Sequence, residues 1–199
     1  MSGGDSNVQI ETVVKLGGRL LADVGCFDSV LAAIRAAADS PSCRLLIVPG
    51  GGPFADTVRD VDRRLGLSDA AAHWMAVMAM DQYAHVIAGR LRGAVIVEGP
   101  SEIAAALDGR LPVLAPSRWL RETDPLPHSW DVTSDSIAAW VAGRVGARRL
   151  VLLKPPGMRA YAEGGAVDAY FSEALPPGVR TEMIPADQID ALRTALRAS

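Results

Sequence analysis

Three short segments of this chain are almost wholly apolar and lack the polar alternation of a half-exposed strand. They are residues 45–48, residues 150–153 and Thr12–Leu16, which is β-branched and apolar with a single lysine, Lys15, set into it. Such strands are covered on both faces, as in the parallel sheets of α/β proteins. Segments with helical periodicity, such as residues 53–65 and 134–146, lie between them. The pattern predicts a three-layer αβα sandwich around a mostly parallel central sheet.

Weaker patterns complete the expected order of elements. Residues 17–27 are expected to connect the first strand to a helix capped by Asp28, and residues 116–128 are expected to form a loop. Further strands are expected at Ala94–Val97, Leu111–Leu114 and 180–184, and further helices at 101–107, 168–175 and 187–197. No repeat or linker divides the chain, which predicts one domain over residues 1–199.

The end of the first strand has the composition of a phosphate site. Lys15 lies there, and Gly17 and Gly18 follow. The backbone of a glycine loop can approach an anion closely, and the lysine supplies a point charge. An ordinary strand with a glycine turn is the alternative. The 20 basic residues favour phosphate, because only Lys15 and Lys154 are lysines and each ends an apolar strand shortly before a glycine.

A second glycine turn follows the strand at residues 45–48. It comprises Gly50, Gly51 and Gly52, and Pro53 suits the first position of the next helix. The order of strand, turn and helix directs free N–H groups and a helix N-terminus toward an anion. Since parallel strands end at one edge of their sheet, both lysines, both glycine turns and the helix start near residue 134 are expected to converge.

A long helix is expected over residues 68–91, capped by Ser68 or Asp69. It is apolar almost all round, which indicates burial on more than one side. Its charged residues exclude a membrane span. Its apolar side chains can face the core alone or both the core and a partner subunit; the second alternative predicts a homodimer or larger homo-oligomer. His73 and His85 are expected to be structural.

Composition narrows the classes of function. The formal net charge of −3 argues against a nucleic-acid partner. Residues 1–8 are polar and do not resemble a signal peptide. Cys26 and Cys43 fit neither a redox nor a zinc motif, so two free thiols and a cytoplasmic location are expected.

The chemistry that remains is phosphoryl transfer. The chain has no Walker loop, no G-x-G-x-x-G after its first strand and no G-x-S-x-G. Phosphoryl transfer depends on positioning and positive charge, which Lys15 and Lys154 can supply from two sides. Asp135, in the first turn of its helix, could hold a lysine or meet a metal ion through water. A carboxylate favoured only by the helix dipole is the alternative.

The ordered set of segments 13–18, 47–53, 131–135 and 150–154 resembles the amino acid kinase family, which includes aspartokinase and uridylate kinase. The resemblance implies an acceptor site in residues 1–130 and a nucleotide site in residues 131–199. ATP and Mg²⁺ are the implied cofactors, with the ion held mainly by nucleotide phosphates and no protein metal ligand assigned.

The resemblance also implies roles for individual residues. Lys15 contacts the transferred phosphoryl group, Asp135 organises the catalytic lysines, and Lys154 takes the place of the family's late lysine, since no lysine follows it. The residues expected to bind the nucleotide are Gly17, Gly18, Lys154, Pro156 and Gly157. The residues expected to bind the acceptor are Gly50, Gly51, Gly52, Pro53, Asp131, Thr133 and Ser134.

Segments 72–76, 80–83 and 127–138 are similar to small kinases of this family that are linked to methanofuran synthesis in methanogens and methylotrophs. This resemblance implies that aminomethylfuran-methyl phosphate is phosphorylated to its diphosphate. Such an acceptor is already an anion and requires no general base. Asp131 is the hypothesised partner of its ammonium group. The alternatives are a nucleotide or isoprenoid monophosphate as acceptor, or a non-catalytic protein that binds an oxyanion or nucleotide.

Overall fold

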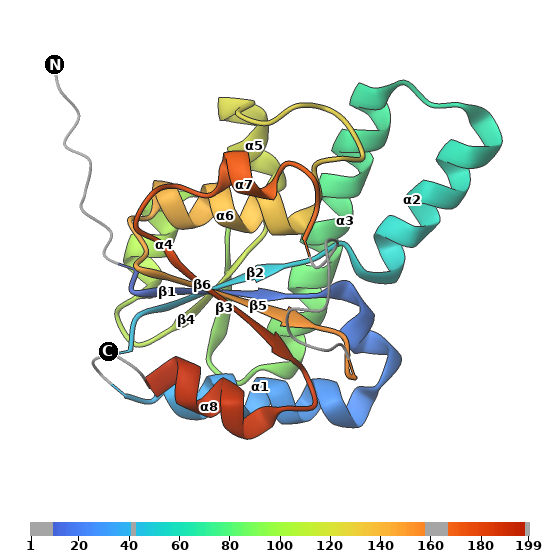
Figure 1. The fold of residues 1–199 in the computed structure, drawn as a ribbon. Coiled ribbons are helices and arrows are strands. Elements are labelled where there is room, and N and C mark those ends of the chain that lie inside the picture. The colour runs from blue at the N-terminus through green and yellow to red at the C-terminus, as the bar shows by residue number, and fades with distance from the viewer. Residues whose placement is uncertain (1–9, 41–42, 158–166, 198–199) are drawn as a thin grey trace, which may run out of the picture.

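Six parallel strands form one sheet in the order β3-β4-β2-β1-β5-β6 (Figure 1). The strands are β1 (Thr12–Leu16), β2 (Leu45–Pro49), β3 (Ala94–Val97), β4 (Leu111–Leu114), β5 (Arg149–Lys154) and β6 (Arg180–Pro185). This computed structural model describes residues 10–40, 43–157 and 167–197, so the expectation for residues 1–8 lies outside it.

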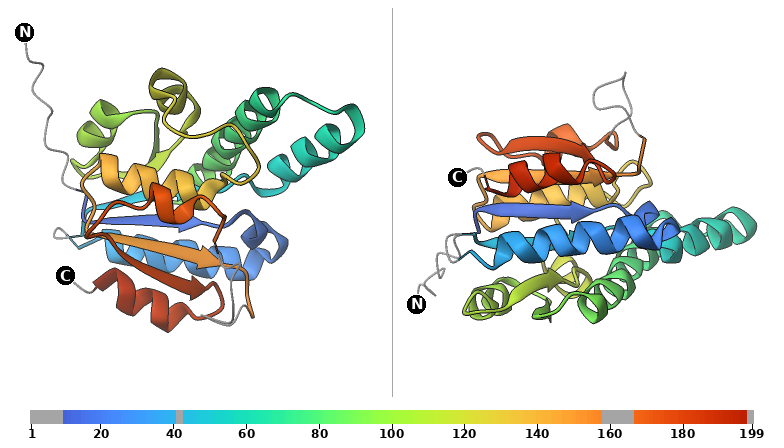
Figure 2. Two further views of the ribbon diagram at one scale, coloured as in Figure 1. Left: turned by 45° about the horizontal axis from the view of Figure 1, so that its top comes forward. Right: turned by 90° about the horizontal axis from the view of Figure 1, so that it is seen from below.

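Helices cover both faces of the sheet, which confirms the three-layer αβα sandwich. One face carries α1 (Val24–Ala38) and α8 (Ile189–Arg197). The other carries α4 (Pro100–Ala106), α5 (Ser117–Thr123), α6 (Ser134–Arg144) and α7 (Phe171–Ala174). The short 3-10 helix η1 (Gly18–Ala22) follows β1. The helices α2 (Gly52–Leu65) and α3 (Asp69–Arg90) extend beyond the sheet, as Figures 1 and 2 show.

Two apolar cores lie on the two faces of the sheet. Because side chains alternate along a strand, Val13 enters the core beneath α6, and Val14 enters the core beneath α1 and α8. The long helix α3 contributes to both cores, through Met80 on one side and Tyr83 on the other. Its N-cap is Ser68, as expected, whose hydroxyl accepts a hydrogen bond from Ala71 N at 3.3 Å.

Strand register brings the glycine turns and the lysines to one edge. Strand β1 lies between β2 and β5, with Leu16 opposite both Pro49 and Leu153. The glycine turns that follow β1 and β2 therefore leave the sheet beside each other, next to the end of β5, where Lys154 lies. This arrangement is the convergence that the sequence predicts.

Two local predictions were wrong. Helix α1 begins at Val24, earlier than expected, and its cap is Asp23, whose carboxylate accepts a hydrogen bond from Cys26 N at 3.0 Å. Residues 116–128, expected to be a loop, contain α5, because Trp119 and Leu120 are buried in the core beside α6. Within the described ranges, no helix combines the length and apolar character needed to cross a membrane.

Candidate active site

A cavity of about 610 Å³ opens at the carboxyl edge of β1 and β5. It is lined by most of the residues that the sequence assigns to a site. These are Lys15, Gly17, Gly18, Gly51, Gly52, Thr133, Ser134, Asp135 and Lys154. The parallel sheet therefore brings together residues up to 139 positions apart in the chain (154 − 15 = 139).

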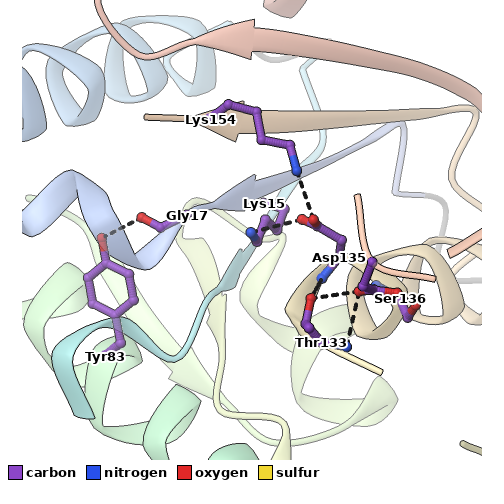
Figure 3. Close-up of polar contacts among 8 residues, drawn as sticks. Lys15, Gly17, Tyr83, Thr133, Asp135, Ser136 and Lys154 are labelled. Atoms are coloured by element: carbon purple, nitrogen blue, oxygen red, sulfur yellow. Dashed lines mark hydrogen bonds and ion pairs between the residues drawn. The ribbon is translucent and has the colours of Figure 1, made fainter. Parts of the chain in front are cut away.

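One carboxylate lies between the two lysines (Figure 3). Lys15 Nζ is 2.9 Å from Asp135 Oδ1, and Lys154 Nζ is 2.7 Å from Asp135 Oδ2. All three residues are buried, with exposed fractions of 6% to 7%. Two ammonium groups share one carboxylate, so the group carries a net charge of +1 when all three are ionised. A buried net positive charge of this kind suits an anionic ligand.

The pKa values follow from this sharing. Burial would raise the pKa of Asp135, but the attraction of Lys15 and Lys154 outweighs burial and holds that pKa below its usual value. Burial lowers the pKa of Lys154, and repulsion by Lys15 adds to the effect, although Asp135 opposes it. The lowered pKa of Asp135 and the lowered pKa of Lys154 are consistent with each other. The Asp135 carboxylate has two cationic partners, whereas the two lysines share one carboxylate.

The two glycine turns touch through their backbones. A Cβ on Gly18 would lie 2.2 Å from Cα and N of Gly52, and a Cβ on Gly17 would lie 2.8 Å from the carbonyl oxygen of Leu153. Gly50 N donates a hydrogen bond to Leu16 O at 2.7 Å. Only glycine fits at these approaches, and the bare backbone leaves room for phosphate oxygens.

A buried tyrosine supports the first of these turns from below. Tyr83 OH donates a hydrogen bond to Gly17 O at 3.4 Å (Figure 3). Its ring stacks on Phe27 with centroids 6.2 Å apart, and burial raises its pKa above the usual range. Tyr83 therefore remains protonated and keeps donating to the turn throughout the physiological range.

The wall of the cavity beside α2 and α3 is aromatic. Trp130 Nε1 donates to Asp62 Oδ2 at 2.8 Å, and the guanidinium of Arg59 lies 4.9 Å from the Trp130 ring centroid. His73 stacks on His128 with centroids 4.5 Å apart. Burial, together with His128, lowers the pKa of His73 to about 4, so its imidazole is neutral at pH 7.

Sequence reasoning missed several residues of this lining, among them Arg19, Arg59, His73, Trp130 and Asp168. His73 was expected to be structural only. The periodicity of α2 and α3 identifies the faces of these helices but does not indicate that one face borders a cavity. For Asp168 the available signal was the start of α6, which is rich in hydroxyl groups and needs an acceptor.

Five predicted site residues do not line the cavity. They are Gly50, Pro53, Asp131, Pro156 and Gly157. Gly50 is buried behind the turn, and Pro53 lies in the first turn of α2. Asp131 is exposed, and its carbonyl accepts a hydrogen bond from Tyr170 N at 3.3 Å. Their roles in binding remain predictions.

The carboxylates of the lining test the fit of a metal ion. Asp135 pairs with both lysines, Asp56 pairs with Arg59 at 2.9 Å, and Asp168 accepts from Thr133 and Ser136. In the part of the chain that the structure describes, no three or more metal-ligating side chains cluster. Each of these lining carboxylates is thus already engaged by cations or hydroxyl groups of the protein.

The fold and the site define an α/β protein with a cationic ligand cavity at the carboxyl edge of a parallel sheet. A model of the amino acid kinase family matches residues 11–155, more than half of the chain. The chain belongs to the amino acid kinase family.

A curated relative is the [5-(aminomethyl)furan-3-yl]methyl phosphate kinase of Methanocaldococcus jannaschii. It is 31% identical over 143 residues, which are 70% of this chain and 63% of the relative. The matched part of the chain thus spans less than two thirds of that protein's length.

Solved structures with the same fold include two uridylate kinases. The uridylate kinase of Archaeoglobus fulgidus has a TM-score of 0.70 at 15% identity, over 95% of this chain and 96% of that chain. The UMP kinase of Ureaplasma parvum has a TM-score of 0.69 at 14% identity, over 93% and 95% of the two chains. At these identities the likeness concerns the fold alone.

Proposed function

We propose that this chain is a phosphotransferase that moves the γ-phosphoryl group of ATP to a phosphate group on a small molecule. One observation carries the proposal: two lysines meet at one buried carboxylate in a cavity bordered by bare glycine backbone. Membership of the amino acid kinase family supports it.

The acceptor that we propose is aminomethylfuran-methyl phosphate, which would be converted to its diphosphate in methanofuran biosynthesis. The named kinase from M. jannaschii supports this acceptor, because it is 31% identical to most of this chain. The aromatic wall with Trp130 and the neutral His73 suits a flat heteroaromatic ring.

The proposed reaction needs little covalent help from the protein. An oxygen of the acceptor phosphate attacks the γ-phosphorus, the bond from that phosphorus to the bridging oxygen breaks, and ADP leaves with the electron pair. Lys15 and Lys154 stabilise the negative charge on the group in transfer from two sides. Asp135 holds both ammonium groups in place. When bound, Mg²⁺ would neutralise charge on the nucleotide phosphates.

The division of the chain into halves is also a proposal. Residues 1–130 would provide the acceptor site, through the turn at Gly51 and Gly52 and the aromatic wall. Residues 131–199 would provide the nucleotide site, with Gly17 and Gly18 at its phosphate end and Pro156 and Gly157 beyond Lys154.

The ammonium group of the acceptor needs a carboxylate. The sequence suggests Asp131, which is exposed and outside the lining, whereas Asp56, which is also exposed, lines the cavity and pairs with Arg59. Asp131→Asn and Asp56→Asn are therefore compared on the acceptor and on an analogue without the amine. The true partner is the residue whose replacement abolishes the preference for the amine; an unchanged preference in both variants rejects both assignments.

Acceptor profiling tests the function itself. The purified protein is incubated with MgATP and, in turn, the furan phosphate, UMP and isopentenyl phosphate, and ADP release is measured together with the mass of the product. Turnover of the furan phosphate alone supports the specific proposal. Turnover of UMP or isopentenyl phosphate instead supports the kinase but not the acceptor. Nucleotide binding without ADP release for every acceptor would identify a binding protein.

We further propose a homodimer or larger homo-oligomer through α3 and a cytoplasmic location. Met78 on α3 is 39% exposed, and the guanidinium of Arg121 lies 4.9 Å from the ring of the neighbouring Trp74. Cys26 and Cys43 are free thiols, which suits a reducing compartment. Light scattering of the wild type and of Met78→Glu tests the interface; a monomeric wild type rejects it.

A further inference from the structure

The carboxylate of Asp168 accepts hydrogen bonds from Thr133 and Ser136 at the start of α6, and this set of bonds is called the clasp below. Its Oδ2 atom accepts hydrogen bonds from Thr133 N at 3.0 Å, from Thr133 Oγ1 at 2.6 Å and from Ser136 N at 3.1 Å. Its Oδ1 atom accepts a hydrogen bond from Ser136 Oγ. Asp168 therefore satisfies backbone and side-chain donors of a helix start that lies more than 30 residues earlier.

The helix's own cap is weak by comparison. Thr133 is the N-cap residue, and its Oγ1 accepts a hydrogen bond from Asp135 N at 3.4 Å, near the limit for such a bond. The same hydroxyl group also donates a shorter hydrogen bond to Asp168 Oδ2, at 2.6 Å. The hydroxyl group of Ser136 is fully buried, and its one described partner is again Asp168.

The clasped turn carries the carboxylate that joins the lysines. Asp135 lies between Thr133 and Ser136, and its side chain points away from the helix start toward Lys15 and Lys154 (Figure 3). A shift of the first turn of α6 would move the Asp135 carboxylate and with it both ammonium groups. Misplacement of reacting groups by about 1 Å can cost about a hundredfold in rate.

We propose that Asp168 is a positioning residue of the phosphotransferase, which fixes the start of α6 so that Asp135 holds Lys15 and Lys154 at the transferred group. This inference rests on the proposed function and adds a residue that acts through Asp135. It also connects Asp168 to Thr133, which lines the cavity and is predicted to bind the acceptor.

The charge of Asp168 matters as well as its hydrogen bonds. A carboxylate at a helix N-terminus is stabilised by the helix dipole. Asp168 also attracts Lys154 and raises its pKa, against the lowering by burial. The charged groups that act on Lys154 are Asp135, Lys15 and Asp168. Removal of the Asp168 charge should therefore lower the pKa of Lys154 further.

Asp168→Asn tests the clasp with nearly unchanged shape. The amide keeps one oxygen that can accept hydrogen bonds from Thr133 and Ser136 N, and its NH2 group can donate to the Ser136 hydroxyl, so the variant removes the negative charge and weakens each charge-assisted bond of the clasp. We expect kcat to fall about tenfold to a hundredfold, while KM for ATP changes less than about threefold, because the groups that contact the nucleotide remain. Asp190→Asn is the matched control, since Asp190 is exposed on α8 and its carboxylate pairs with nearby Arg193.

A second measurement does not depend on turnover. Because the chain has only two lysines, isotope-labelled lysine gives two sets of ε-methylene NMR signals, which Lys15→Arg and Lys154→Arg assign. In Asp168→Asn we expect the Lys154 signal to titrate at lower pH than in the wild type, and in Asp190→Asn at the same pH. Part of this shift is the direct loss of the Asp168 charge, so the same titration is followed in Ser136→Ala, which weakens the clasp and leaves every charge in place.

Ser136→Ala covers the case in which Asp168→Asn does not fold. It removes one hydrogen bond of the clasp, and we expect a smaller fall in kcat that is not additive with Asp168→Asn in the double variant. Wild-type kcat and an unmoved Lys154 titration in the folded variants would overturn the inference. If the wild type turns over no acceptor, the proposed function fails, and the Lys154 titration in Ser136→Ala, where no charge is lost, decides the inference.

Discussion

Lys15 and Lys154 lie on the neighbouring parallel strands β1 and β5, and their ammonium groups contact the two oxygens of one carboxylate. Neither lysine has a carboxylate of its own among the described residues. The pair therefore remains poorly neutralised, and a phosphate group entering the cavity would supply the missing negative charge. The pairing of the two strands thus sets both the spacing and the charge of the site.

Removing either ammonium group should abolish most of the proposed activity. We expect Lys15→Met and Lys154→Met each to lower kcat by about a hundredfold to a thousandfold, because preorganised charge at the transferred group contributes on this scale. Steady-state kinetics with the identified acceptor measures the effect. Arg193→Met on α8 is the control for loss of a cation. Kinetics within twofold of wild type in both lysine variants would contradict the mechanism.

The alkaline side of the pH profile should report on Lys154. The lysine is charged below its pKa and neutral above it, and burial lowers that pKa from 10.5. We therefore expect kcat to decline with rising pH before pH 10.5 is reached. Lys154→Arg should move the decline to higher pH, since a guanidinium group stays charged. If the decline does not move in Lys154→Arg, another group titrates there.

A methyl group at the contact between the glycine turns should damage the site. The Cβ of Gly18→Ala would lie 2.2 Å from backbone atoms of Gly52, which cannot yield as a side chain can. We expect a lower melting temperature and a large loss of activity. Gly89→Ala in α3 is the matched control, because its Cβ meets nothing within 4 Å, and alanine in a helix should stabilise by about 0.5–1 kcal/mol.

His73 should lower the free energy of unfolding in mild acid. Burial is the main cause and His128 the second cause that lowers the pKa of His73 from 6.5 to about 4. As the pH falls, the unfolded chain therefore takes up this proton at a higher pH than the folded chain does. The His73 contribution is therefore constant above pH 6.5 and destabilises the fold progressively between pH 6.5 and about 4. His73→Gln should remove this part of the loss in denaturant titrations across that range. Parallel losses in both proteins would show that His73 is not the group involved.

The sequence predicted the centre of the site because its residues are tied to strand ends. Lys15, the glycine turns and Lys154 each directly follow or end an apolar strand, and a parallel sheet leaves little choice of where such positions meet. The structure places Asp135 at the same edge for a related reason, because Asp135 lies in the first turn of a helix that starts there.

The residues that the sequence did not predict depend on contacts between distant segments. Asp168 has no motif around it, and only the folded chain shows that it meets Thr133 and Ser136. Helix α1 was predicted too short because Gly25 weakens the helical pattern of its first turn. Helix α5 was missed because its few apolar residues lie within a segment rich in proline and charge.

The placement of α3 has a consequence for how this protein loses its structure. Met80 and Tyr83 pack the same helix into apolar clusters on opposite faces of the sheet. Opening of either cluster would therefore displace α3 from the other cluster. The amide protons of both outer layers should consequently share one slow opening event in hydrogen exchange, and the site between them should melt with the whole domain rather than ahead of it.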